Sequence, residues 1–216
     1  MFAPFGFYNA SDFNPGEILW ITATPTDSDQ DSVISELEGL GFTITVVDEG
    51  TGPYNPNNYQ AVFIHEDVNS GTAWATLDTS TRGNTTAGAV ISETALYDEF
   101  LNGNTGQSLS GTNTFTITSA GSTHPITKNY AGSIDPGNLT GRCNLMVSGS
   151  SLANWDTNSI YPIINVYDIG DNDEGGTPQN GRRVTLPFGN NNGTMNSTGK
   201  DIWVRAIQWA AGDTRL

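Results

Sequence analysis

The chain has 216 residues, enough for one large domain with a sizeable core, and 36% of them are hydrophobic. Its formal net charge is -15, because the sequence has 23 Asp and Glu residues and only 8 Lys and Arg residues. A surface this acidic repels phosphate groups, so nucleic acids and anionic membranes are not expected partners. The remaining polar positions are filled mainly by Asn, Thr and Ser, a composition common on extracellular and particle-surface proteins.

The single cysteine, Cys143, excludes an intramolecular disulfide, and it stands at the start of an apolar run where a small buried residue fits. No stretch approaches the roughly 20 apolar residues of a membrane span. The first residues lack the basic region and the continuous apolar core of a signal peptide. We therefore expect a protein without a signal peptide, located in the cytoplasm or in an assembly such as a virion.

Residues 1–16 are expected to form an aromatic N-terminal arm. Their aromatic side chains are interleaved with proline and glycine in a pattern that is neither helical nor alternating. Aromatic side chains dominate interface energetics, so the arm either docks on a neighbouring protein or folds back over its own domain. The candidate binding residues are Phe2, Phe5, Phe7, Tyr8 and Phe13.

From residue 17 onward, short apolar runs alternate with helical patterns, which indicates β-α-β units and a parallel sheet. In the first helical pattern, apolar residues recur at helical spacing and a glycine follows them as a C-cap. The segment 70–84 is expected to hold a further short helix. The predicted strands are 17–23, 42–48, 59–67 and 88–93, and the predicted helices are 33–40 and 94–103.

The pattern changes in the second half of the chain. Short polar strands separated by Gly and Asn turns predict an antiparallel insertion at about 104–160, within a single domain that spans 17–216. Strands are expected at 114–118 and 144–149 inside it. Two further strands, 161–170 and 182–190, read as a hairpin-like pair that returns to the sheet, and a C-terminal helix is predicted at 198–211.

The order of these segments resembles the class I glutamine amidotransferase-like superfamily, and within it the ThuA-like (trehalose-utilisation) branch. The motifs that carry the resemblance are "ILWITATPTDSD", "YQAVFIHEDVNS", "GAVISETALYDEF", "HPIT" at 124–127 and "RRVTLPFGN" before the terminal helix. The resemblance covers roughly residues 17–212. It implies an α/β fold with a flavodoxin-like, doubly wound, mostly parallel sheet.

The catalytic pattern of the superfamily is degenerate in this chain. Glutamine amidotransferases place a cysteine after the strand that corresponds to "GAVISE", where this sequence has Ser92 and Glu93. They also carry His and Glu two residues apart near the end of the chain, and neither His65 nor His124 lies in such a pair. Amidotransferase chemistry needs a thiolate and its base, so we do not expect it here.

Acidic residues follow the predicted strands and form the candidate catalytic site. Ligands of open α/β sheets bind beyond the carboxyl ends of the strands, where Glu66, Asp67 and Glu93 would gather with His65. Clustered carboxylates can act as acid and base or hold a hard cation. The alternative is that these side chains cap the following helices and accept hydrogen bonds from loop amides.

A second acidic group is the one candidate for a metal. The segment "DIGDNDEGG" has the carboxylate density of a calcium site but not the spacing of an EF-hand, and the favoured alternative is a solvated acidic hairpin tip. The turn after the first strand has no glycine to cradle a phosphate, and we expect no cofactor. The candidate metal ligands are Asp168, Asp171, Asp173 and Glu174.

Three functions remain open. The first is a non-enzymatic structural or interaction protein with protein partners or further copies of itself, such as a bacteriophage capsid or tail component. The second is a ThuA-like enzyme acting on carbohydrate through the carboxylate cluster, which rests on fold analogy. The third is a carbohydrate-binding module whose exposed aromatic rings, among Tyr54, Trp74, Tyr130 and Trp155, stack on sugars.

Overall fold

The structure is a computed structural model that describes residues 13–25, 28–81, 84–102, 106–108, 114–137, 139, 141–143, 148–188 and 195–216. Within these ranges, nine strands form one sheet in the order β2-β1-β3-β4-β11-β10-β9-β6-β7. The first five strands of that order are parallel to one another and the remaining neighbours are antiparallel. The predicted mostly parallel α/β sheet is therefore confirmed.

The parallel half has the strand order of flavodoxin-like folds. The chain leaves β1 toward β2 on one side and later returns to β3 on the other, so the order reverses between β1 and β3. This reversal is the switch point where doubly wound sheets open a crevice. The strands are β1 (Glu17–Thr22), β2 (Thr43–Asp48), β3 (Ala61–Ile64), β4 (Gly88–Ile91) and β11 (Arg183–Thr185).

The antiparallel half extends the sheet beyond β11. The pairing of β10 with β11, followed by the parallel pairing of β11 with β4, confirms the predicted return to the sheet. The strands are β6 (Phe115–Ile117), β7 (Ser133–Ile134), β9 (Ser150–Trp155) and β10 (Pro162–Tyr167). A separate pair consists of β5 (Gly106–Ser108) and β8 (Gly141–Cys143).

The prediction of a strand at 144–149 is wrong for its last two residues. Residues 144–147 lie outside the described residues, and Ser148 and Gly149 precede β9 instead of belonging to a strand. The strand that pairs with β10 and β6 is the more polar segment that follows, which the sequence did not single out. The proposed boundaries at residue 16 and at about 104–160 stay predictions.

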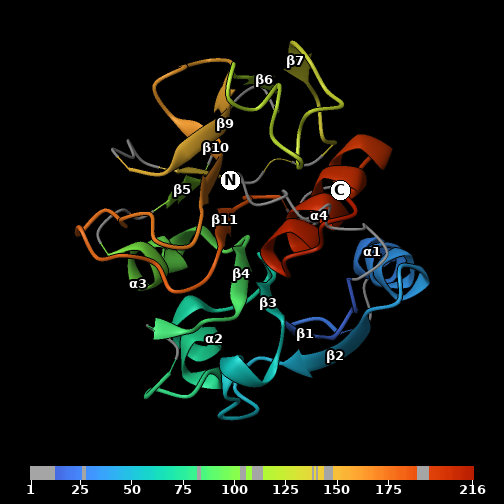
Figure 1. Ribbon diagram of the computed structural model, residues 1–216, viewed down its shortest axis with the longest axis vertical. Coiled ribbons are helices and arrows are strands. Elements are labelled where there is room, and N and C mark those ends of the chain that lie inside the picture. Colours follow the sequence, from blue (N-terminus) through green and yellow to red (C-terminus); the bar gives the residue numbers. More distant parts are fainter. Residues whose placement is uncertain are drawn as a thin grey trace, which may run out of the picture.

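Helices cover both faces of the parallel half (Figure 1). On one face, α1 (Ser28–Gly39) and α4 (Ser197–Ala210) pack over alternate strand residues such as Ile18, Trp20 and Phe63. On the other, α2 (Ser70–Thr76), α3 (Tyr97–Leu101) and the 3-10 turn η3 (Thr94–Leu96) cover the opposite set. A further 3-10 turn, η1 (Pro56–Asn58), precedes β3. None of the helices in the described ranges has the length and apolar character that crossing a membrane requires.

Aromatic rings form the centre of the core beneath α4. The ring of Phe63 lies 4.1 Å from that of Trp20 and 5.0 Å from that of Trp203, measured between centroids. All three side chains are fully buried. Tilted and edge-on aromatic pairs of this kind add about 0.5–1.5 kcal/mol each beyond the area they bury. They fix α4 over β1 and β3, next to the switch point.

One residue of the expected arm is described, and it packs on its own domain. The Phe13 ring lies 5.9 Å from that of Phe42, and the Arg215 guanidinium stands 5.1 Å above it. The other arm residues, Phe2, Phe5, Phe7 and Tyr8, lie outside the described residues. For Phe13, the structure therefore favours the folded-back alternative.

Candidate functional site

Three buried side chains form a row at the carboxyl ends of the central strands. Ile21, Ile64 and Ile91 are partners in the registers of β1, β3 and β4, so the next residues are Thr22, His65 and Ser92. Their backbones continue the ladder, since His65 N–H donates to Ile21 O and Ser92 N–H to Ile64 O. Since side chains alternate between faces, all three project toward the α1 and α4 side.

A hydrogen-bond network joins this row to the loop after β3. The Asp67 carboxylate accepts from Thr22 Oγ1 at 3.0 Å and from the Ala23 amide at 3.1 Å. Gln30 on α1 donates to Thr22 Oγ1 at 3.1 Å and accepts from the Trp20 indole at 2.7 Å. The network ties the ends of β1 and β3 to α1 across the switch point.

His65 and Asp67 form a buried pair in this network. His65 Nδ1 lies 2.8 Å from Asp67 Oδ1, with 0% and 7% of the two side chains exposed. Burial by itself raises the pKa of Asp67, but hydrogen bonds from His65, Ala23 and Thr22 and the His65 charge lower it to about 2. The Asp67 amide also donates a hydrogen bond to Nδ1 at 3.2 Å.

Three polar atoms on this face have no hydrogen-bond partner among the described residues: His65 Nε2, Ser92 Oγ and Trp203 Nε1. The His65 and Trp203 rings lie 5.4 Å apart. Ser92 and His65 thus occupy neighbouring strand ends on one face, yet no hydrogen bond joins them.

Glu93, which follows Ser92 at the end of β4, caps its own turn. Its Oε1 accepts from the Ala95 amide at 2.8 Å, and its φ of -69° and ψ of 111° are ordinary extended values. Burial, together with the charges of Glu66 and Glu49, raises the pKa of Glu93. Glu49 after β2, Glu66 after β3 and Glu93 after β4 therefore lie at the same edge of the sheet. Glu93 has the helix-capping role that the sequence analysis gave as the alternative to catalysis.

The predicted metal ligands serve local roles. Asp173 accepts from Gly175 and Thr177 amides and from two side-chain amides, whereas Glu174 accepts from Tyr167 and Ser148. Asp168 pairs with Arg182 at 3.0 Å, and Asp171 accepts from the Asp168 amide. Among the described residues, no three His, Cys, Asp or Glu side chains are grouped to hold a metal ion. The calcium site and the hairpin-tip alternative both stay predictions.

The remaining reactive side chains are also engaged. Cys143 is fully buried 3.0 Å from the Thr185 hydroxyl, and burial raises the pKa of its thiol to about 12. His124 accepts from the Ile126 amide, and burial lowers its pKa to about 4. Neither supplies the thiolate or the base of an amidotransferase.

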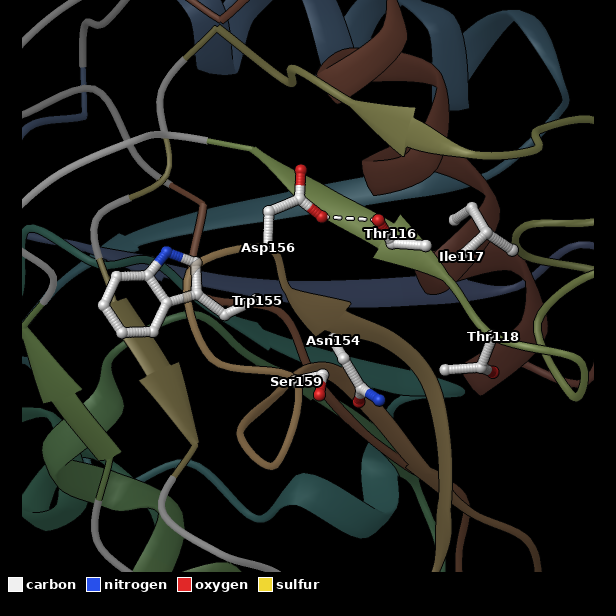
Figure 2. Close-up of a pocket in the computed structure, with 7 residues that line it drawn as sticks. All are labelled: Thr116, Ile117, Thr118, Asn154, Trp155, Asp156 and Ser159. Atoms are coloured by element: carbon white, nitrogen blue, oxygen red, sulfur yellow. Dashed lines mark hydrogen bonds between the residues drawn. The ribbon is translucent and has the colours of Figure 1, made fainter.

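Of the aromatic residues considered for sugar stacking, Trp74 packs edge-on against Phe100 at 4.9 Å. Tyr130 donates to Asp201 at 2.6 Å. Trp155 is among the residues that line a surface pocket in the antiparallel half, but in Figure 2 its ring points away from Asn154 and Asp156, and the Arg142 guanidinium lies 5.7 Å from the ring centroid. This pocket lies at the far end of the sheet order from β1 and β3.

Comparison with known proteins bears on the fold. No family model and no curated protein matches the sequence. Solved structures do match over nearly the whole chain. A ThuA-like protein from Bacteroides uniformis has a TM-score of 0.53 at 12% identity, covering 96% of this chain and 95% of that one. The chain has the amidotransferase-like fold.

Two other solved structures agree with this assignment. A ThuA-like protein from Parabacteroides merdae has a TM-score of 0.51 at 14% identity and covers 91% of this chain and 90% of its own. A GMP synthase subunit from Thermoplasma acidophilum has a TM-score of 0.54 at 11% identity, and the match covers 90% of this chain and 94% of that one. At these identities the likeness shows the fold of the ThuA-like and amidotransferase-like proteins and leaves the activity open.

Sequence reasoning missed three contributors to the site: Thr22, Gln30 and Trp203. Thr22 ends a strand that was predicted, so its place beside the end of β3 follows once β1 and β3 are paired. Gln30 lies in the first turns of α1, ahead of the apolar residues that predicted the helix. Trp203 lies within the predicted C-terminal helix, and only the three-dimensional packing brings its indole to His65.

Proposed function

We propose that this chain is a non-enzymatic structural or interaction protein built on an amidotransferase-like fold with a degenerate catalytic site. One observation carries the proposal: the strand-turn-helix joint after β4 holds no available nucleophile. Ser92 is buried without a hydrogen bond to His65, and the Glu93 carboxylate is used to cap η3. The thiol of Cys143 is buried in β8.

The composition supports an assembly component, such as a bacteriophage capsid or tail protein. The chain is acidic, poor in Lys and Arg, and rich in residues that form turns and bond their own backbone. Its aromatic arm offers side chains suited to a protein interface. A net charge of -15 keeps such a chain soluble before it meets its partner.

The alternative of a carbohydrate-active enzyme needs a proton donor among Glu66, Asp67 and Glu93. Asp67 is unsuited to this role, because its pKa of about 2 keeps it ionised at neutral pH. Burial and neighbouring carboxylates raise the pKa of Glu93, which is the direction that a general acid requires. With Asp67 excluded, the enzyme alternative depends on Glu93 and Glu66.

An activity assay tests the proposal through Glu93. The purified chain and its Glu93→Gln variant are incubated with glutamine and, separately, with neutral disaccharides, and ammonia or reducing sugar is measured. We expect no turnover above buffer for either protein. Turnover by the native chain that Glu93→Gln abolishes would establish an enzyme and overturn the proposal.

A further inference from the structure

The segment between β6 and β7, residues 118–132, lies beside the helix α4 (Figure 1). The guanidinium of Arg205 on this helix donates to the Pro125 carbonyl at 3.3 Å. The Tyr130 hydroxyl donates to the Asp201 carboxylate at 2.6 Å. These contacts are made by single side chains and not by a strand ladder. The attachment of the segment to α4 therefore responds to the state of individual side chains.

His124 is the titratable side chain of this attachment. Its Nδ1 accepts a hydrogen bond from the Ile126 amide at 3.3 Å. Its ring lies edge-on to the Trp209 indole of α4, with 5.0 Å between the two centroids. A ring nitrogen accepts only when it carries no proton, so the first of these contacts requires a neutral imidazole. In the imidazolium both nitrogens are donors, and an N–H group would then face the Ile126 N–H group.

The charged groups on the elements around His124 include more cations than carboxylates. The Trp209 indole already has a cation on it, because the Arg182 guanidinium lies 4.8 Å from the ring centroid. The other charged groups are Asp168, which pairs with Arg182, Asp201 and Arg205, which pair on α4, and Lys128, whose amide donates to the His124 carbonyl. A proton added to His124 would bring a further positive charge to this neighbourhood.

These surroundings favour the neutral form of His124. Burial lowers its pKa, the Asp168 charge acts in the opposite direction, and the Arg182 charge lowers the pKa further, to about 4. A histidine released to water has a pKa of about 6.5. Because the value in the attached state is the lower one, the attachment is strongest above about pH 6.5 and weakens as the pH falls toward 4.

From these observations we infer that His124 is a pH switch: its protonation weakens the attachment of segment 118–132 to α4. The switch works through two contacts, the loss of the Ile126 hydrogen bond and the approach of a second cation to the Trp209 ring. Trp209 is 6% exposed while the segment is attached. Opening of the segment would expose more of this indole, an aromatic surface of the kind that protein interfaces use. The inference is independent of the proposed function.

An NMR titration and hydrogen exchange on the full chain test the switch. The chain has two histidines, so the Hε1 signal of His124 is assigned by its loss in His124→Asn. We expect this signal to titrate with a midpoint near pH 4. Between pH 7 and pH 5, protection of the Ile126 and Lys128 amides, corrected for the intrinsic exchange rate, should fall about twentyfold, the factor that pKa values of about 4 and 6.5 give. Protection of the β3 amides should stay constant.

The matched control is His124→Asn. An asparagine oxygen accepts from the amide two residues later, as in Asx turns, and it does not titrate. This variant should keep the protection of the Ile126 amide at pH 7 and lose its pH dependence. Three results would overturn the inference: a His124 midpoint near pH 6.5, constant protection of the segment from pH 7 to pH 5, or an equal fall in His124→Asn. If the variant failed to fold, the first two results, both from the native chain, would still decide.

Discussion

Asp67 is the residue on which the polar network at the switch point depends. It receives hydrogen bonds from the end of β1 and lies against His65 after β3, so one carboxylate links two strands whose order reverses there. A buried carboxylate with several donors is stabilised in its ionised form. The same interactions that make Asp67 a poor proton donor make it a structural link.

Replacing Asp67 by Asn should lower the free energy of unfolding at pH 7 by about 2 kcal/mol, because hydrogen bonds to a charged group are lost. The folded-state pKa of about 2 lies below the unfolded value, so the contribution is present above about pH 4 and is lost as the pH falls toward 2. Urea unfolding between pH 7 and pH 2 measures both effects. The exposed Asp48→Asn serves as control, and equal losses in the two variants would contradict the role of Asp67.

Two buried hydroxyls of the same row should respond differently to removal. Ser92 Oγ has no partner among the described residues, so Ser92→Ala should change stability by less than about 0.5 kcal/mol. Thr22 Oγ1 donates to Asp67 and accepts from Gln30, so Thr22→Val should cost about 1–3 kcal/mol. Thermal and urea unfolding of both variants provide the comparison. A loss in Ser92→Ala as large as that in Thr22→Val would show that the Ser92 hydroxyl is bonded.

Among the elements, α4 is held by close contact as well as by its aromatic residues. A Cβ placed on Gly88, at the start of β4, would lie 2.1 Å from the carbonyl oxygen of Ala210. Only glycine lets the end of the helix approach the strand this closely. The position of α4 over the parallel half therefore depends on Gly88.

Gly88→Ala should consequently destabilise the fold by about 1–3 kcal/mol, since α4 has to move away from β4. Gly39, at the end of α1, has no atom within 4 Å of a built Cβ, and Gly39→Ala should be neutral or stabilising by up to about 1 kcal/mol. Circular dichroism during thermal unfolding measures both. If the two variants melted alike, the contact between β4 and α4 would not be the constraint that the structure indicates.

The parallel half was predictable because its strands are continuous apolar runs separated by helical patterns. The antiparallel half was less predictable. The strand β9 contains Ser150, Ser151 and Asn154, and its pairing with β10 includes register shifts, so no simple alternation marks it. The candidate carboxylates could be placed at one edge from strand order alone, but the link from Asp67 to Thr22 required the folded chain.

The molecule as a whole combines an amidotransferase-like fold with features suited to protein partners. The joint after β4 has a strand-turn-helix form in which Glu93 caps the turn, and the chain carries a net charge of -15 and an aromatic N-terminal segment. Phe13 packs on Phe42, so an arm that reaches a partner must lie before it. Residues 1–12 are therefore the segment to remove.

Light scattering coupled to size-exclusion chromatography, on the full chain and on a chain lacking residues 1–12, is the decisive experiment for an interaction role. We expect the full chain to self-associate above its monomer mass of 23.0 kDa and the shortened chain to be a monomer. The shortened chain should keep the same circular dichroism spectrum, because Phe13 and its contacts remain. If both chains were monomers, the proposed role of the arm in association would be contradicted. The carboxylates Glu66, Asp67 and Glu93 at the edge of the sheet would then be the next site to test for ligand binding.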